Sequence, residues 1–256
     1  MDKETVDKIT LSYMNEKHLF ECFMNAVVDI FKLEPELNQY GHPIIYTIKS
    51  RLKDVEHLRD KIERKWNDED PLTPQNLFER VTDLAGVRVL HLYQDQFSQI
   101  HNLIQKQIDN GDWFLRENPV AYSWDPESSN YFEGLGIESK VKDSYYTSIH
   151  YVIKPKLDSN ICCEIQIRTL FEEIWGEIDH TINYPHPTEK IACKEQLRVL
   201  SKLVSTGTRL ADSIFRTHNE PSVPLLGSTK NLGTSVAKID SLNLAQMALR
   251  FFRIKF

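Results

Sequence analysis

The sequence predicts an α+β fold with about five strands and several helices. Apolar residues recur every three to four positions in long segments and every second position in short ones. Two of the short segments are joined by the turn-forming stretch KLDSN, which favours an antiparallel hairpin. The chain has 256 residues, of which 41% are hydrophobic and 27% charged, so it can bury a sizeable core.

The first 66 residues predict two amphipathic helices, at about 4–31 and, after the breaker stretch 34–43, at about 52–66. Acidic and basic residues alternate on the second helix. From the residues alone, this pattern favours a solvated face with intrahelical ion pairs over a binding surface. The basic residues in and beside this segment are Arg51, Lys53, Arg59, Lys61, Arg64 and Lys65.

The centre of the chain predicts the first strands. Gly86 ends a helical pattern, and residues 87–93 (VRVLHLY) are typical of a buried strand. A helix at about 95–108 follows, and then strand-like stretches at about 113–122 and 137–141.

The hairpin predicted over 145–168 brings polar residues together. Pairing its apolar positions buries one face of both strands. The paired sets are Ile149, Tyr151 and Ile153 on one strand and Cys163, Ile165 and Ile167 on the other. The opposite face then carries Ser148, His150, Glu164, Gln166 and Arg168. Such a face indicates either a site or an ordinary solvent-facing surface.

Two further helices are expected beyond the hairpin. One carries Leu170, Ile174, Ile178 and Ile182, and a long one spans about 188–217; the spacing predicts that both pack on the core. A linker containing Pro, Gly and Ser follows. We expect four segments, which are an N-terminal helical segment at 1–45, the main domain at 46–185, a packing helix at 186–218, and a linker with a basic tail at 219–256.

Charge and cysteine usage exclude several classes of protein. A formal charge of −6 argues against a protein that coats nucleic acid or anionic membrane, so any phosphate site must be local. The four cysteines include no CxxC pair, which argues against a zinc site or a disulfide framework. No apolar run is long enough to span a membrane and no leader is visible, so we expect a cytoplasmic protein without a membrane partner.

Five motifs follow one another in order over about 140 residues: SRLK, TDLAGVRVL, SKVKDSYYTSIHYVI, EIQIRTLFEEIWGEIDH and NYP. Together they resemble the synthetase domain of the RelA/SpoT family, especially its compact single-domain alarmone synthetases. The resemblance implies a mixed sheet flanked by helices and related to nucleotidyltransferases. It also implies transfer of the β,γ-pyrophosphate of ATP to the 3′-hydroxyl of GDP or GTP, with release of AMP.

The resemblance also implies roles for individual residues. Asp83 and Glu164 match the family's acidic pair and would hold Mg²⁺. Asp83 is expected as a metal ligand, and Glu164 as either a ligand or the acceptor of the hydroxyl proton. Arg51 and Arg88 match the arginines that sandwich adenine. Lys53, Arg59 and Lys61 match or neighbour the residues that bind the triphosphate, which replaces the interpretation of a merely solvated helix face.

On the acceptor side, Tyr146 matches the aromatic residue that stacks the acceptor base. His150, Gln166 and Arg168 are then expected around the acceptor ribose and phosphates, with His180 as a weaker candidate. For each of these residues the alternative is an ordinary polar residue of the sheet or its edge.

Two departures from the family pattern keep a second acceptor open. Ser144 and Tyr145 replace the usual Asn-Gly, which stiffens the loop and adds a ring. The stretch DHTINYP lacks the lysine or arginine that often follows the corresponding histidine, so one partner for acceptor 5′-phosphates is missing. Toxin-like relatives modify the 3′ end of tRNA instead. The surplus of positive charge in the tail could hold an RNA backbone, cover the domain or bind a partner.

Three functions therefore stay open at this point: an alarmone synthetase, a tRNA-modifying toxin, and a non-catalytic nucleotide-sensing module. A homo-oligomer and an antitoxin or regulatory partner are equally open.

Overall fold

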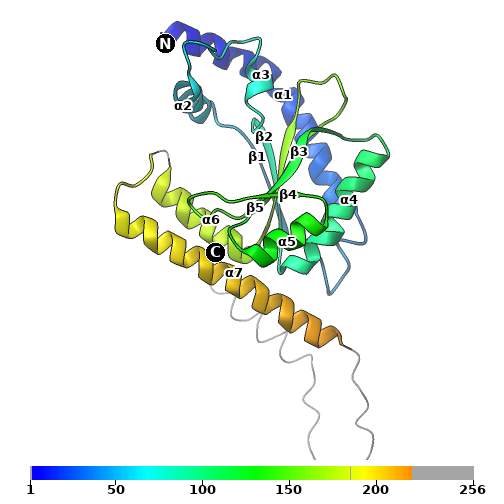
Figure 1. Cartoon of the computed structure of the whole chain (residues 1–256). Helices are drawn as coiled ribbons and strands as arrows, with labels where there is room; N and C mark the ends of the chain where they lie inside the picture. The colour runs from blue at the N-terminus through cyan, green and yellow to red at the C-terminus, as the bar shows by residue number, and fades with distance from the viewer. Residues whose placement is uncertain (1, 185, 221–256) are drawn as a thin grey trace, which may run out of the picture. The chain divides into compact units, whose positions relative to one another are not determined.

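The computed structural model describes residues 2–184 and 186–220 (Figure 1). The described residues up to Asn219 form one compact unit. The predicted basic tail lies almost entirely outside the described residues. Within the described part, no helix combines the length and apolar content needed to cross a bilayer.

A six-stranded mixed sheet forms the centre of the fold, so the predicted fold class is confirmed with one more strand than expected. The strands are β1 (Thr47–Leu52), β2 (Ala85–His91), β3 (Phe114–Tyr122), β4 (Glu138–Lys140), β5 (Ser148–Lys154) and β6 (Cys163–Thr169). Their order is β1-β2-β6-β5-β3-β4. The pairs β2–β6 and β3–β4 are parallel and the others antiparallel.

Helices lie on both faces of this sheet (Figure 1). They are α1 (Lys3–Leu33), α2 (Val55–Lys65), α3 (Leu77–Arg80), α4 (Phe97–Asp109), α5 (Pro126–Gly134), α6 (Leu170–Asn183) and α7 (Ile191–Asn219), with a 3₁₀ turn at Gln94–Gln96. Helix α1 contacts β1, β2 and β6, whereas α6 contacts β2 and β6 and packs against α7. The sequence did not predict α5.

The apolar face of the sheet is the main core. Ile149 pairs with Ile167 and Tyr151 with Ile165, which confirms the predicted hairpin register. These four side chains are at most 2% exposed. The Tyr151 hydroxyl lies 2.7 Å from Nδ1 of His101 on α4, so α4 covers this face together with α1.

The predicted helix at 52–66 begins too early. Residues Thr47–Leu52 form the edge strand β1, which pairs with β2, and α2 starts only at Val55. The Asp54 carboxylate caps α2 by accepting hydrogen bonds from the backbone N–H groups of Glu56 and His57. Because Arg51 and Lys53 precede this cap, they do not share a helix with Lys61.

The predicted core stripe of α6 is also wrong. Ile174, Ile178 and Ile182 are 57%, 38% and 37% exposed, whereas Glu172, Glu173 and Trp175 are buried. Helix α6 covers the polar face of the sheet, so its inward side carries carboxylates that meet basic strand residues. In α7, Leu197 and Val204 are buried as predicted, but Leu210 and Ile214 are exposed.

Candidate active site

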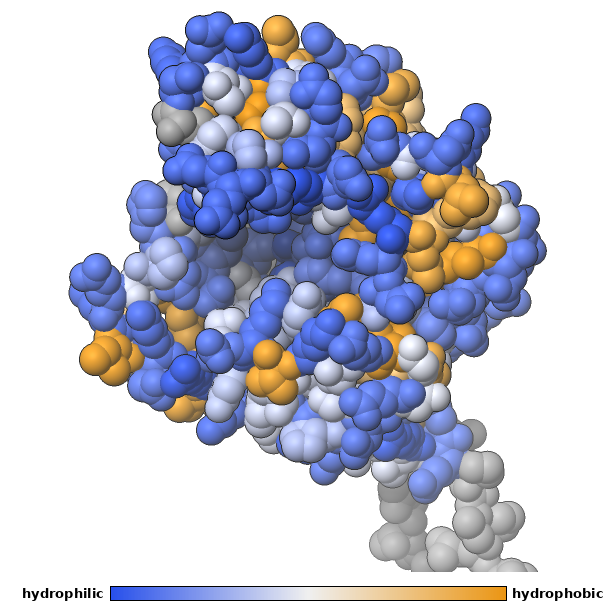
Figure 2. All heavy atoms as spheres, turned by 45° about the horizontal axis from the view of Figure 1, so that its top comes forward, coloured by the Kyte–Doolittle hydropathy of each residue, from blue (hydrophilic) through white to orange (hydrophobic). Residues whose placement is uncertain are grey.

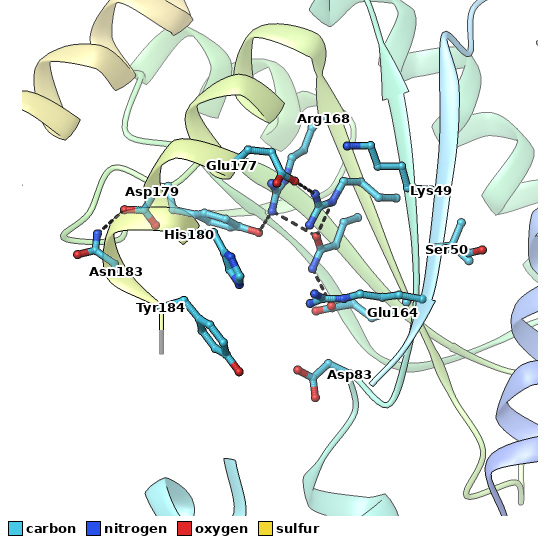
Figure 3. Close-up of a pocket in the computed structure, with 17 residues that line it drawn as sticks. Lys49, Ser50, Asp83, Glu164, Arg168, Glu177, Asp179, His180, Asn183 and Tyr184 are labelled. Atoms are coloured by element: carbon cyan, nitrogen blue, oxygen red, sulfur yellow. Dashed lines mark hydrogen bonds and ion pairs between the residues drawn. The ribbon is translucent and has the colours of Figure 1, made fainter. Parts of the chain in front are cut away.

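A cavity of about 540 Å³ lies between the polar face of the sheet and α6. Strands β1, β2 and β6 form one wall, and the C-terminal part of α6 with Tyr184 forms the other (Figure 3). Figure 2 shows a hollow in the surface rimmed by hydrophilic side chains.

The strand register arranges the side chains on the floor of this cavity in rows that run across the sheet. Arg51 pairs with Gly86, and Gly86 pairs with Glu164. Directly opposed residues point to the same face of a sheet. Gly86 has no side chain, so open space remains between the Arg51 and Glu164 side chains.

The next row consists of charged and hydrogen-bonding side chains. Lys49 pairs with Arg88, Arg88 with Gln166, and Gln166 with His150. This row crosses four strands, because β6 lies between β2 and β5. Three of the residues predicted for the site are thereby brought side by side.

The Glu164 carboxylate is held by two neighbours. Nδ1 of His150 lies 2.9 Å from Oε1, and Nε2 of Gln166 donates to Oε2 at 2.8 Å. Burial alone would raise the pKa of Glu164, but the hydrogen bonds from His150 and Gln166 outweigh burial and hold it below its ordinary value. The side chain is therefore an anion at neutral pH.

A hydrogen-bond chain continues from Glu164 to the predicted acceptor side. The Tyr146 hydroxyl accepts from Nη2 of Arg168 and lies 2.9 Å from Nε2 of His150. Because a guanidinium can only donate, the hydroxyl proton is free to point at His150, whose Nδ1 proton then faces Glu164. Glu164, His150, Tyr146 and Arg168 thus form one connected network.

Asp83 lies in the loop before β2 and is paired with two lysines. Nζ of Lys53 is 3.1 Å from Oδ2, and Nζ of Lys61 is 2.7 Å from Oδ1. Burial would raise the pKa of the Asp83 carboxyl, but the positive charges of both lysines keep it below its usual range. The loop after β1 and helix α2 thus deliver two cations to one carboxylate.

Asp83 and Glu164 face the same cavity (Figure 3). Their charges interact, since the negative charge of Asp83 opposes ionisation of Glu164. Among the described residues, no cluster of three or more His, Cys, Asp or Glu side chains could hold a metal without help. Two carboxylates with hard oxygen donors nevertheless fit Mg²⁺, which commonly takes one or two protein carboxylates and completes its shell with water and substrate phosphates.

The two predicted adenine-binding arginines line the cavity, but their surroundings differ. Arg51 is exposed to solvent. Arg88 is bound by two carboxylates of α6, with Nη1 at 2.8 Å from Glu173 Oε1 and 2.9 Å from Glu177 Oε1. Their role in binding adenine stays a prediction.

Arg59 lies outside this cavity. Its Nη1 pairs with Oδ1 of Asp7 on α1 at 2.5 Å, and the residue lines a separate open groove between α1 and α2. The structure therefore does not bring Arg59 to Asp83, and its triphosphate role stays a prediction.

Aromatic residues lie on the acceptor side. The Tyr146 ring packs edge-on against Tyr122 and Trp175, and Nζ of Lys142 lies 4.3 Å from its centroid. On the opposite wall, His180 stacks on Tyr184 with 4.5 Å between ring centroids. Tyr146, His180 and Tyr184 all line the cavity.

Tyr145 does not supply the second ring expected over the acceptor. Its φ of 61° is unusual for a residue with a side chain, and its ring stacks on Trp124 with 5.5 Å between centroids. Its carbonyl accepts a hydrogen bond from Ser201 on α7. Tyr145 is absent from the cavity lining and instead fixes the loop to α7.

Sequence reasoning missed several residues of the α6 wall. The charged and polar ones that line the cavity are Glu177, Asp179 and Asn183, followed by Tyr184. Glu173 is not part of the lining but binds Arg88, which is. Polar positions on a helix usually indicate solvent, so local periodicity gave no signal. The surplus of basic residues on the facing strands could have revealed that buried carboxylates must meet them.

Comparison with known proteins gives consistent matches. Residues 50–189 match the family model described as a region found in RelA / SpoT proteins. The chain is 26% identical over 180 residues to the GTP pyrophosphokinase YwaC of Bacillus subtilis (strain 168), which covers 67% of this chain and 75% of that protein.

Solved structures are similar in fold. The small alarmone synthetase 1 from Bacillus subtilis superposes with a TM-score of 0.60 at 21% identity, covering 82% of this chain and 96% of that one. The same synthetase bound to its product pppGpp gives a TM-score of 0.59 at 22% identity, covering 80% and 95%.

Proposed function

Because residues 50–189 are more than half of the chain, the protein belongs to the RelA/SpoT family, and we propose that it is an ATP-dependent pyrophosphokinase. In this reaction the 3′-hydroxyl oxygen of GDP or GTP attacks the β-phosphorus of ATP. The bond between that phosphorus and the α,β-bridging oxygen breaks, AMP leaves, and the hydroxyl proton passes to a base or to water. The products are AMP and a guanosine nucleotide with a 3′-pyrophosphate.

The observation that carries this proposal is the convergence of two carboxylates and several cations on one cavity. Asp83 and Glu164 both line it, and Lys53 and Lys61 lie against Asp83. Polyphosphate transfer needs positioning and charge neutralisation more than covalent chemistry. This arrangement can supply both.

On the donor side, we assign the triphosphate to Lys53 and Lys61 and the adenine to Arg51 and Arg88. When phosphates enter, the two lysines can exchange part of their pairing with Asp83 for the phosphate oxygens. Asp83 and Glu164 would hold Mg²⁺, which would supply positive charge to neutralise the transferred group.

On the acceptor side, the hydrogen-bond network favours Glu164 as the group that orients the attacking hydroxyl. Its pKa lies below the ordinary value, and a weakly basic carboxylate is better suited to accepting a hydrogen bond or binding a cation than to keeping a proton. The guanine base of the acceptor would stack on the Tyr146 ring. His150, Gln166 and Arg168 would then lie near the ribose and its phosphates.

The relatives support the choice of acceptor. One is named a GTP pyrophosphokinase, and the solved complex of small alarmone synthetase 1 contains its product pppGpp. Guanosine nucleotides are therefore the first acceptors to test.

Purified full-length protein should be incubated with γ-labelled ATP, Mg²⁺ and either GDP, GTP or bulk tRNA. The proposal predicts AMP release that depends on a free guanosine nucleotide, with label in that nucleotide. Label in RNA alone would support the tRNA-modifying alternative. If no AMP is released with any acceptor, the non-catalytic nucleotide-sensing module would be supported instead.

A further inference from the structure

We propose that Glu173 is a positioning residue that fixes the donor-side Arg88 and the acceptor-side Arg168 relative to each other. This inference rests on the proposed function for the names of the two sides. The geometry that supports it is independent of any substrate.

Glu173 lies at the centre of three cations. Its Oε1 is 2.8 Å from Nζ of Lys49, and both its oxygens contact Nη1 of Arg88 at 2.8 and 3.0 Å. Its Oε2 is 3.4 Å from Nη1 of Arg168. The three basic residues come from three neighbouring strands, β1, β2 and β6, so one helical carboxylate spans half of the sheet.

The ion pair between Glu173 and Arg168 is buried, so solvent screens it little. The Glu173 side chain is 7% exposed and that of Arg168 is 5% exposed. The Arg88 side chain is 21% exposed, so the guanidinium groups of Arg88 and Arg168 repel one another strongly unless an anion lies between them. The Lys49 side chain is 54% exposed, so solvent screens its ammonium. Without the Glu173 charge, Arg88 keeps the more exposed Glu177 carboxylate as a partner, whereas Arg168 loses the carboxylate with which it pairs. Both guanidinium groups should therefore shift from their present positions, Arg168 the more.

Gln166 connects the two arginines to the Glu164 carboxylate. Its Oε1 accepts from Nε of Arg88 at 3.3 Å and from Nη2 of Arg168 at 3.2 Å. Those bonds fix the amide orientation, and its Nε2 is thereby directed to Glu164 at 2.8 Å. Displacement of either arginine would disturb the support of the Glu164 carboxylate.

A second feature shows that α6 is shaped around Arg168. A Cβ atom placed on Gly176 would lie 2.5 Å from Nη1 of Arg168. Real Cβ contacts are not this short, so only glycine at this position leaves room for the guanidinium in its present place. Gly176 lies almost one helical turn after Glu173, and the two residues thus confine Arg168 from the same helix.

The test compares Glu173→Gln with Glu172→Gln. Glu172 is a matched control, because it is the adjacent residue of the same helix, is 7% exposed, and binds the Thr169 backbone N–H away from the cavity. Glutamine preserves that bond. Affinity for α,β-methylene ATP and for GDP, and kcat and KM for transfer, are to be measured for both variants and for the wild type.

We expect Glu173→Gln to lower kcat/KM by roughly 100-fold, as misplaced groups near reacting atoms do, and to weaken binding of both nucleotides. Glu172→Gln should stay within about 3-fold of wild type in all constants, the ordinary scatter of changes outside a site. Combining Glu173→Gln with Arg88→Met should cost much less than the product of the single effects, because Glu173 acts through Arg88.

Gly176→Ala keeps the Glu173 charge and covers the case in which Glu173→Gln does not fold. It should raise the KM for the acceptor more than the KM for ATP, because it displaces Arg168 alone. Equal losses in both Glu→Gln variants, additive effects in the double variant, or an unchanged Glu173→Gln enzyme would overturn the proposal. If the wild type transfers nothing to any acceptor, the proposed function fails, but α,β-methylene ATP affinity still tests Glu173.

Discussion

Each oxygen of the Glu164 carboxylate has its own donor, and this makes the residue a fixed anion at the cavity floor. Its neighbours in the strand, Cys163 and Ile165, are fully buried on the opposite face. Successive residues of β6 therefore alternate between the packed core and the cavity.

Replacing Glu164 by Gln should reduce pyrophosphate transfer by at least about 100-fold, because the charge that binds Mg²⁺ or orients the hydroxyl is lost. The far-UV circular dichroism spectrum should not change, since the amide retains the shape of the side chain. Transfer at the wild-type rate would show that the reacting groups are elsewhere.

Two substitutions of Tyr146 can distinguish the role of its ring from the role of its hydroxyl. Tyr146→Ala should weaken acceptor binding by about 1–3 kcal/mol, the usual loss for a base–aromatic stack. Tyr146→Phe should retain most acceptor affinity but lower kcat, because the hydroxyl links Arg168 to His150. Equal acceptor affinity in the wild type and the Ala variant would show that the acceptor base stacks on another residue, such as Tyr184.

Among the elements, the hairpin was predictable and β1 and α6 were not. Alternation fixed the register, because a shift of one residue would expose the apolar face. It is strict in the sequence of β6 and is interrupted in β5 only by the apolar, buried Val152. Strand β1 lies at the sheet edge and carries polar residues such as Lys49 and Arg51, so its sequence resembles a polar helix start. The inward face of α6 depends on cations from distant strands, which no local pattern contains.

Helix α7 packs against the turn at Gln94–Gln96 through a buried acid. The Asp212 carboxylate is 4% exposed and accepts a hydrogen bond from the backbone N–H of Asp95 at 2.9 Å. Burial raises the pKa of Asp212 to about 6. The folded protein therefore binds this proton more tightly than the unfolded chain does.

For this reason, Asp212 should lower the free energy of unfolding as the pH rises from about 4 to about 6, by on the order of 1–3 kcal/mol, with no further loss above that range. Asp212→Asn keeps the acceptor oxygen and removes the titration. Urea unfolding at both ends of the range should show the variant gaining stability over wild type as the pH rises. A constant difference between the two proteins would contradict this account.

At the scale of the whole described unit, the sheet divides the protein into two functional layers. Helices α1 and α4 cover the apolar face, whereas α6 covers part of the polar face and leaves the cavity open beside it. The core can therefore remain packed while polar-face residues are changed. The meeting of Asp83 and Glu164, which are distant in the sequence, was expected only from the family resemblance, because no local spacing connects them.

The most direct test of the central claim is a crystal structure of the protein with α,β-methylene ATP and Mn²⁺ in place of Mg²⁺. We predict an anomalous manganese peak coordinated by Asp83, Glu164 or both, with the triphosphate at Lys53 and Lys61 and the adenine between Arg51 and Arg88. A manganese ion and triphosphate bound away from both carboxylates would contradict the proposed active site.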